Sequence, residues 1–262
     1  MNLKRTWNKK YGKSVIYAKE NSGCQKVEID MLRLRDGETK GYKEKDKEYA
    51  LVVLGGKCTV TGEDFSFKNV GKRKDVFDGP ATCVYLPANQ PFSVTAVGEV
   101  SIAVCKSPSV SRRKPILIQP EDVVIKQLGK PGWEREAHFI LDERTEADML
   151  YIGEAFVKGG QWASYPPHKH DDDNMPTEAE TEEIYYYEFK KPQGFGVQRV
   201  YTMEGDIDEI YTVKSGDFVE IPKGYHPFHA APGYDNYYLW VMAGKDRGFF
   251  MTTDQDHAWL NQ

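Results

Sequence analysis

The clearest chemical signal in the sequence is a set of histidines and one glutamate in its second half. His168 and His170 are separated by one residue, Glu183 opens the apolar segment EIYYYEF, and His226 ends the turn PKGYH. On a strand, His168 and His170 would point to the same face because side chains alternate. Three neutral imidazoles and one carboxylate suit a divalent transition metal such as Zn, Mn, Fe, Co or Ni. Ca and Mg prefer oxygen ligands.

A metal held in this way predicts a particular kind of chemistry. If two adjacent coordination positions stay free, an α-hydroxy aldehyde can bind through both oxygens, and the metal polarises its carbonyl as a Lewis acid. An aldose–ketose isomerase needs this arrangement. The alternative is that His168 and His170 are a chance surface pair and that His226 is a turn residue with its bonds satisfied. The joint spacing, including G(x)5PxGxH ending at His226, favours the metal site.

The elements that must position these residues are short segments in which apolar and polar residues alternate. They are separated by Gly, Pro and Asp, and their period of two predicts an all-β protein. An internal repeat is also visible, because YLPANQPF resembles EIPKGYHPF. A glutamate precedes the first proline of each segment at the same separation, Glu48 in the first copy and Glu183 in the second. The pattern indicates two copies of one β unit.

Two Gly- and Pro-punctuated antiparallel units of this size are typical of a pair of jelly-roll β-barrels. We therefore predict a bicupin, with an N-terminal cupin-like barrel over residues 1–110 and a metal-binding barrel over residues 120–262. The basic, proline-containing segment 107–120 reads as the linker. All six histidines follow residue 137. The first unit is therefore expected to be a scaffold or an interface, which is compatible with a homo-oligomer.

Composition limits the partners that the chain is expected to have. A net charge of −5 argues against a nucleic-acid binder. No apolar run approaches the ~20 residues that cross a bilayer, and the basic N-terminus is followed by no apolar stretch typical of a secretory signal. The four cysteines form no CxxC pair and are expected to be reduced. These features predict a cytoplasmic protein that acts on a small molecule, without nucleic acid or membrane partners.

The second half resembles a cupin with both metal motifs, in the variant found in the 5-deoxy-glucuronate isomerases of bacterial inositol catabolism. The resemblance rests on SYPPHKHDDDN, EEIYYYEFKKPQGFGVQRVYT and GDFVEIPKGYHPFHAAPGYDNYYLWVMAG. In the first half it rests on YALVVLGGKCTVTG and VYLPANQPFSVTA, so it covers most of the chain. The related 4-deoxy-uronate ketol isomerases have a shorter gap between HxH and the glutamate. The longer gap here, residues 171–182, favours the inositol branch.

The resemblance implies metal ligands at His168, His170, Glu183 and His226. It selects Glu183 over the neighbouring Glu182, because the family's glutamate is followed by a small or branched residue and then by aromatics. It also implies conversion of 5-deoxy-D-glucuronate to 2-deoxy-5-keto-D-gluconate in myo-inositol catabolism. Three alternatives remain open: an isomerase of a related deoxy uronate, a cupin dioxygenase, and a non-catalytic cupin that binds a sugar acid.

Two further roles need residues outside the metal set. The carboxylate of a sugar acid needs a cation, and arginine matches a carboxylate with two parallel hydrogen bonds. Arg199 and Arg135 are the candidates, with Lys223 third; the alternatives are an outward strand residue for Arg199 and a solvated loop charge for Arg135. An enediol mechanism needs a base that moves a proton between adjacent carbons. Tyr187 and His229 rank first for that role, ahead of Tyr185, whereas a hydride shift would need no base.

Two acidic features are expected to be structural. The consecutive aspartates 171–173 resemble a second metal site, but consecutive side chains point in different directions, so a solvated loop is predicted. Glu48 has no histidine near it in the first unit. We expect it to pair with a neighbouring cation.

Overall fold

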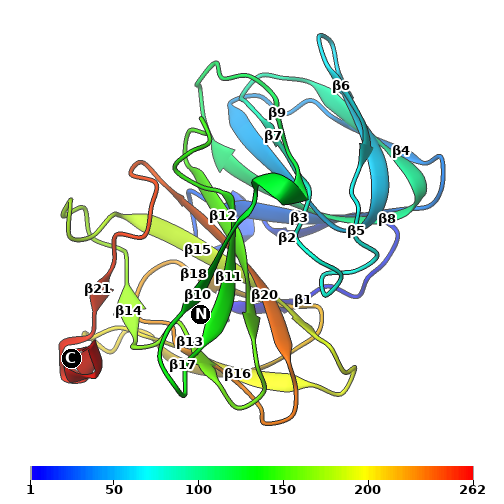
Figure 1. Ribbon diagram of the computed structural model, residues 1–262. Coiled ribbons are helices and arrows are strands. Elements are labelled where there is room, and N and C mark those ends of the chain that lie inside the picture. The colour runs from blue at the N-terminus through cyan, green and yellow to red at the C-terminus, as the bar shows by residue number, and fades with distance from the viewer. Residues whose placement is uncertain (1, 262) are drawn as a thin grey trace.

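The structure, a computed structural model, describes residues 2–261 as two barrel-like units packed against each other (Figure 1). The described residues form the following strands and short 3₁₀ helices: β1 Lys4–Thr6, β2 Gly12–Tyr17, η1 Lys19–Asn21, β3 Glu28–Leu34, β4 Thr39–Tyr42, β5 Lys47–Gly62, β6 Ser66–Val70, β7 Cys83–Leu86, β8 Phe92–Pro108, β9 Ile116–Ile118, η2 Pro120–Asp122, β10 Val124–Leu128, β11 Arg135–Leu141, β12 Leu150–Val157, β13 Trp162–Ala163, β14 His168–Lys169, β15 Thr181–Phe189, β16 Phe195–Tyr201, β17 Asp208–Lys214, β18 Asp217–Ile221, β19 Phe228–Ala230, β20 Asn236–Gly244, β21 Thr252–Thr253 and η3 Gln255–Asn261. Within this range no helix is long and apolar enough to span a bilayer. The all-β prediction is confirmed.

The first unit is one antiparallel sheet that curves into a barrel. Its strand order is β2-β3-β8-β5-β7-β9, with β4 on β8 and β6 on β5. The long strands β5 and β8 shift register at Gly55 and Gly56. A side chain at Gly56 would place its Cβ 2.0 Å from the carbonyl oxygen of Glu99, and its φ is +89°. Only glycine fits this close approach, and such irregularities let a sheet bend over itself.

The second unit has two facing sheets that enclose the candidate site. One has the order β1-β18-β15-β20-β12-β11-β10 and the other β13-β19-β16-β17, with β14 and β21 as a separate pair. Alternation along β15 divides its residues between two cores. Tyr185 and Tyr187 point into this barrel, whereas Ile184 and Tyr186 join a core shared with the first unit. Glu183 has the same orientation as Tyr185 because it precedes it by two residues.

The interface between the units is apolar, with a buried ion pair across it. Arg73 of the first unit contacts Glu154 of the second, with Nη2 2.6 Å from Oε1, and both side chains are almost fully buried. Tyr237 donates a hydrogen bond to the same carboxylate at 2.8 Å. The contacts with Arg73 and Tyr237 offset the free-energy cost of burying the charge of Glu154. All four cysteines are free thiols and are buried, as expected.

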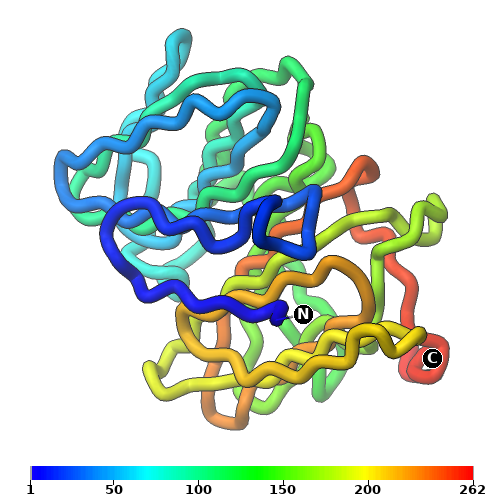
Figure 2. Tube along the Cα trace, turned by 180° about the vertical axis from the view of Figure 1, so that it is seen from behind, coloured from blue at the N-terminus to red at the C-terminus, as the bar shows by residue number. Residues whose placement is uncertain are grey.

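The predicted limits of the two units, residues 1–110 and 120–262, stay a prediction. At the N-terminus, a strand within the first range pairs with a strand of the second unit. Strand β1 pairs with β18 of the second unit, so the chain begins there before it enters the first (Figure 2). Strand β9, inside the predicted linker, pairs with β7 of the first unit. The linker is therefore partly built into a sheet.

The predicted correspondence between Glu48 and Glu183 is wrong by one residue. Glu183 pairs with Ile221, the residue before the turn proline, and in the first unit the matching pair is Tyr49 with Leu86. A one-residue offset moves a side chain to the other face of a strand. Glu48 therefore faces the interface, where its carboxylate accepts hydrogen bonds from the backbone N–H groups of residues 148–150. These donors, with the Tyr85 hydroxyl, take the place of the expected cation.

In the first unit, the place that corresponds to the candidate site holds an ion pair. Tyr49 lies opposite Lys106 there, as Glu183 lies opposite Met242 in the second unit. The ammonium of Lys106 lies 2.9 Å from Oδ2 of Asp30, and both side chains are buried. A lysine with its own counterion therefore fills this end of the first barrel.

Candidate metal centre

Three separate segments bring the predicted ligands together. His168 lies on β14, which pairs with β21, and His170 follows it directly. Glu183 points inward from β15, and His226 follows the turn after β18. Gly224 in that turn has φ +93°, and a Cβ there would lie 2.4 Å from the carbonyl oxygen of Tyr201. The glycine is thus required for the close approach that aims His226 at the barrel interior.

The side chains converge on the carboxylate of Glu183. Its Oε2 lies 3.2 Å from Nε2 of His170 and 3.3 Å from Nε2 of His226. The ring of His168 lies beside them, with its centroid 4.9 Å from that of His226. One ligand atom each from His170, Glu183 and His226 lies within 4.8 Å of the others, and all three side chains are buried. All four predicted ligands are therefore neighbours.

Hydrogen bonds orient the three imidazoles in the same way. Nδ1 of His168 donates to the carbonyl of Pro166 at 3.1 Å, and Nδ1 of His170 donates to that of Thr181 at 3.1 Å. Nδ1 of His226 donates to the carbonyl of Gly224 at 2.9 Å. A carbonyl oxygen can only accept, so Nδ1 carries the hydrogen in His168 and His226. In His170 the same tautomer satisfies the carbonyl, and the Thr181 hydroxyl, 2.8 Å from Nδ1, can donate or accept. In a neutral imidazole this leaves a lone pair on Nε2, the arrangement that metal-binding histidines adopt.

Electrostatics favour the neutral, metal-ready form of two of the imidazoles. Burial lowers the pKa of His168 to about 3 and that of His226 to about 3. Burial also acts to lower the pKa of His170, but its hydrogen bond to Glu183 and the negative charge of that residue leave the pKa raised. Nε2 of His226 is buried without a hydrogen-bond partner. Its lone pair and the carboxylate oxygen face each other as two acceptors, which a cation between them would resolve. The donor set therefore fits a divalent transition metal.

A cavity of about 70 Å³ adjoins the imidazoles. Its polar walls, besides the candidate ligands, are Arg135, Ser164, Tyr185 and Tyr238. The apolar walls are Leu128, Ala137, Ala155, Trp240, Met242, Phe249 and Met251. The hydroxyls of Ser164 and Tyr185 are hydrogen-bonded to each other at 2.8 Å and are buried. A cation and paired hydroxyls thus line the same small cavity as His168, His170 and Glu183.

Among the cations predicted to bind substrate, Arg135 lies in the cavity and the other two lie outside it. Arg199 is half exposed, with Nε 2.9 Å from Oδ1 of Asp208 and its guanidinium 3.9 Å from the ring centroid of Tyr201. Lys223 pairs with Asp206 at 2.6 Å on the surface. The outward orientation of Arg199 on its strand is the alternative that the sequence left open.

The two residues ranked first as a base do not reach the cavity. Tyr187 shares a face with Glu183, but it is fully buried and its hydroxyl donates to Oε1 of Gln198 at 2.6 Å. His229 lies on β19 between the buried Phe228 and Ala230, so alternation turns it away from the barrel interior.

Of the hydroxyl groups that line the cavity, sequence reasoning considered that of Tyr185, which it ranked below Tyr187 and His229, and missed those of Ser164 and Tyr238. Tyr185 carried a signal, because it follows Glu183 by two residues on the same strand face. Tyr238 lies on that face too, since it pairs with Tyr187 across β15 and β20. Ser164 lies in a loop before β14, and its approach to Tyr185 has no local signature.

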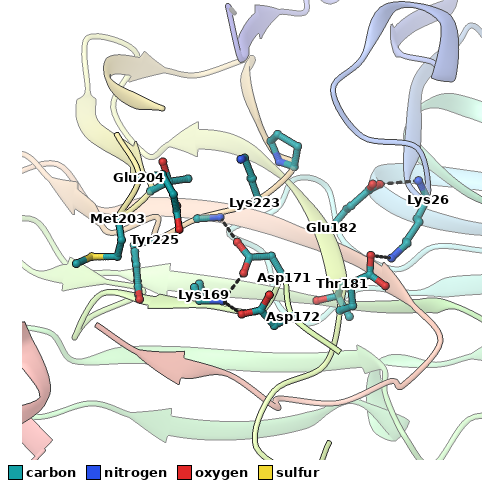
Figure 3. A pocket seen from close by; sticks show the side chains of 14 residues that line it. Lys26, Lys169, Asp171, Asp172, Thr181, Glu182, Met203, Glu204, Lys223 and Tyr225 are labelled. Carbon is teal, nitrogen blue, oxygen red and sulfur yellow. Dashed lines mark hydrogen bonds and ion pairs between the residues drawn. The ribbon is translucent and has the colours of Figure 1, made fainter. Parts of the chain in front are cut away.

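The aspartates at 171–173 form a cluster that a lysine occupies. Ligand atoms of Asp171, Asp172 and Glu178 lie within 4.8 Å of one another, which is close enough for a metal ion. The ammonium of Lys169 contacts all three carboxylates, at 2.6 Å for Asp172 and 2.8 Å for Glu178. Figure 3 shows its contacts with Asp171 and Asp172. The predicted solvated loop therefore describes the exposed Asp172 and Asp173, whereas Asp171 is half-buried and bonded within the fold.

The paired barrels, one with a buried cluster of imidazoles and a carboxylate, define a two-barrel cupin with a candidate metal centre. The fold matches that of Lactobacillus farciminis oxalate decarboxylase in its formate complex, with a TM-score of 0.70 over 97% of this chain and 88% of that one. At 12% identity this likeness concerns the fold alone. The bicupin prediction is confirmed.

The chain belongs to the KduI/IolB family, whose model matches residues 3–260. A 5-deoxy-glucuronate isomerase of Geobacillus kaustophilus is 42% identical over 250 residues, which cover 95% of this chain and 91% of that protein. One from Bacillus subtilis strain 168 is 40% identical over 242 residues, covering 92% and 89%. The crystal structure of an IolB-like protein from Salmonella typhimurium has a TM-score of 0.95 at 38% identity, with each chain fully covered.

Proposed function

We propose that this protein is a metal-dependent 5-deoxy-glucuronate isomerase that converts 5-deoxy-D-glucuronate to 2-deoxy-5-keto-D-gluconate in myo-inositol catabolism. The names of the curated relatives support the reaction. The observation that carries the metal requirement is the buried Nε2 of His226, which lacks a hydrogen-bond partner and lies 3.3 Å from the carboxylate of Glu183. A cytoplasmic location and a sugar acid as the partner belong to the same proposal.

His168, His170, Glu183 and His226 would hold one divalent transition metal ion, of the group Zn, Mn, Fe, Co and Ni. Such an ion supplies Lewis-acid polarisation of the substrate carbonyl. The protein contributes fixed geometry, because each Nδ1 bond to a backbone carbonyl stops its ring from rotating. It also excludes water, since these side chains are buried or half-buried.

Arg135 would bind the carboxylate of the sugar acid. It lines the cavity, and within residues 2–261 no carboxylate lies within the 4.0 Å of its guanidinium that defines an ion pair. An arginine without a counterion beside this cavity is suited to an anionic ligand. The need of a sugar acid for a cation, which first singled out this residue, and the position of Arg135 in the cavity wall support the same role.

Tyr185 would hold and move a proton at the substrate oxygens. Burial raises the pKa of Tyr185 well above its usual value, so its hydroxyl stays protonated. The bond to Ser164 lets the pair donate at one oxygen while accepting at another. Interconversion of an aldose and a ketose needs such a transfer between adjacent oxygens as well as between adjacent carbons.

Substrate entry requires part of the cavity wall to move. At about 70 Å³ the cavity is well below the roughly 300–1,000 Å³ of typical ligand pockets. Phe249 and Met251 lie in the segment between β20 and β21, outside regular structure, and Phe249 is 40% exposed. Displacement of this segment would open the cavity.

Removal of metal is expected to abolish isomerisation of 5-deoxy-D-glucuronate, and restoring one suitable divalent ion is expected to recover it. The measurement is product formation before and after chelator treatment, with Zn, Mn, Fe, Co and Ni added back one at a time. Unchanged activity in chelator-treated protein shown to be metal-free would contradict the metal requirement. Oxygen uptake during turnover would instead favour a dioxygenase, and binding of the sugar acid with its recovery unchanged would favour a non-catalytic cupin.

Replacing Arg135 with methionine is expected to raise the KM for the sugar acid roughly 10- to 100-fold. A hydrogen bond to a charged group is worth about 1.5–3 kcal/mol, and methionine keeps the apolar stem while removing that bond. The measurement is the steady-state kinetics of this variant, with Arg199→Met as the control. Arg199→Met removes the surface ion pair with Asp208 and should change KM less than about twofold. The opposite ranking would return the carboxylate-binding role to Arg199.

A further inference from the structure

Lys169 lies between two candidate ligands but points to the opposite side of the chain. His168 and His170 face the barrel interior, whereas the ammonium of Lys169 lies among the carboxylates of Asp171, Asp172 and Glu178. Figure 3 shows its contacts with the two aspartates. Glu178 is 3% exposed, so its charge requires a counterion. Its Oε1 also accepts hydrogen bonds from the backbone N–H groups of Asp171 and Asp172. The lysine thus holds the loop after His170 in a single folded arrangement.

Asp171 connects this loop to the turn that carries His226. Its Oδ2 accepts a hydrogen bond of 2.6 Å from the backbone N–H of Gly224. The carbonyl of Gly224 in turn accepts the Nδ1 hydrogen of His226 at 2.9 Å. A continuous path of polar contacts therefore runs from the Lys169 ammonium through Asp171 and Gly224 to an imidazole of the candidate centre.

Strand pairing does not provide this connection. Strand β14, with His168, pairs with β21, whereas β18, which precedes the turn of His226, pairs with β15 and β1. The sheet ladders therefore fix Glu183 relative to the turn. The HxH segment is tied to β15 by a backbone hydrogen bond of 2.8 Å from the N–H of Thr181 to the carbonyl of His170, and it contacts the turn itself through the side chain of Asp171. A metal site is sensitive to the spacing of its ligands, because outer contacts that orient the ligands commonly change affinity 10- to 100-fold.

We propose that Lys169 is a positioning residue for the metal centre, acting through Asp171 and Gly224 on the separation between the HxH imidazoles and His226. The inference rests on the metal site of the proposed function. It states that Lys169 influences the coordination geometry and the metal affinity of that site. Three carboxylates this close repel one another unless a cation lies among them. Without the ammonium, Asp171 would turn toward solvent and release Gly224.

The test uses the full chain, stripped of metal and titrated with Co(II), whose visible absorption reports coordination geometry. Lys169→Met is expected to weaken Co(II) affinity about 10- to 100-fold in competition with a chelator and to change the visible spectrum of the bound ion. Lys169→Arg, which keeps the charge, is expected to recover most of the affinity and the native spectrum. Lys26→Met is the matched control, because Lys26 lines the same surface pocket and pairs with Glu180 at 2.7 Å.

A native affinity and spectrum in Lys169→Met would overturn the proposal, as would an equal change in Lys26→Met. If Lys169→Met does not fold, as judged by circular dichroism and thermal unfolding, Asp171→Asn takes its place. That variant keeps the side-chain volume and weakens both contacts of Asp171, so it is expected to show the same spectral change, and a native spectrum would overturn the proposal equally. Failure of the proposed function is distinguishable, since native protein would then bind Co(II) without isomerising the sugar acid.

Discussion

Replacing Glu183 with glutamine is expected to abolish tight metal binding and, with it, isomerisation. Glu183 is the one carboxylate among the four candidate ligands, and its Oε2 lies 3.2 and 3.3 Å from two imidazole nitrogens. Glutamine has nearly the same shape but no charge, and neutral amides are poor ligands for transition metals beside imidazoles. The loss of affinity should exceed the roughly 10- to 100-fold that follows removal of an outer contact. Chelator competition and steady-state kinetics on the same preparations measure both quantities.

The adjacent Glu182 provides a matched control for this experiment. It points to the other side of β15, where its Oε2 accepts hydrogen bonds from the backbone N–H groups of Gln25 and Lys26. Glu182→Gln is therefore expected to keep metal affinity and kcat within a few-fold of the native values. If Glu182→Gln lost metal while Glu183→Gln kept it, the ligand assignment would have to move by one residue.

The predicted ligands could be found from the sequence because residue type identifies the metal-binding groups and strand alternation determines the face to which each side chain points. An HxH pair on a strand must place both rings on one face, and a proline and a glycine restrict the turn before His226. Local sequence therefore fixed the direction of each side chain. Folding of the barrel then brings together segments that are far apart in the chain.

The residues around the ligands were harder to predict, because their roles depend on the opposite sheet. Tyr185 and Tyr187 share a face and a residue type, and they differ only in which partner each hydroxyl meets, Ser164 for one and Gln198 for the other. Arg199 and Arg135 likewise differ in whether a carboxylate lies nearby, and Asp208 becomes the neighbour of Arg199 only when β16 pairs with β17.

The first unit illustrates a second limit of sequence reasoning. The spacing between glutamate and proline matched in both copies, yet the strands pair one residue apart, so Glu48 faces the interface and Tyr49 takes the interior position. Sequence alone does not reveal that offset, because both registers keep an apolar face buried. The ion pair of Lys106 with Asp30 then occupies this end of the barrel. The second unit thus has imidazoles at its candidate metal centre, whereas the corresponding place in the first unit holds the ammonium group of Lys106.

Replacing Tyr185 with phenylalanine is expected to lower kcat by roughly 10²- to 10⁴-fold, the range that follows loss of a positioned acid or base. Metal affinity should stay native, because Tyr185 is not a ligand and its ring remains. Tyr187→Phe is the matched variant, since it removes a hydroxyl that contacts Gln198 outside the cavity. It should cost about 1–3 kcal/mol of stability through the buried partner that it leaves unpaired, with little change in kcat.

The comparison also separates two ways of moving hydrogen during isomerisation. An enediol route predicts that native enzyme working in D₂O incorporates deuterium at the carbon that receives the proton. In Tyr185→Phe, which loses proton transfer between the substrate oxygens, incorporation and turnover should slow together. A hydride shift between the adjacent carbons predicts no incorporation in either protein. A near-native kcat in Tyr185→Phe would remove the hydroxyl from the mechanism, and a larger fall in Tyr187→Phe would move the role to the residue that sequence ranked first. Incorporation requires exchange of the transferred proton with solvent, which the cavity permits when the wall formed by Phe249 and Met251 opens.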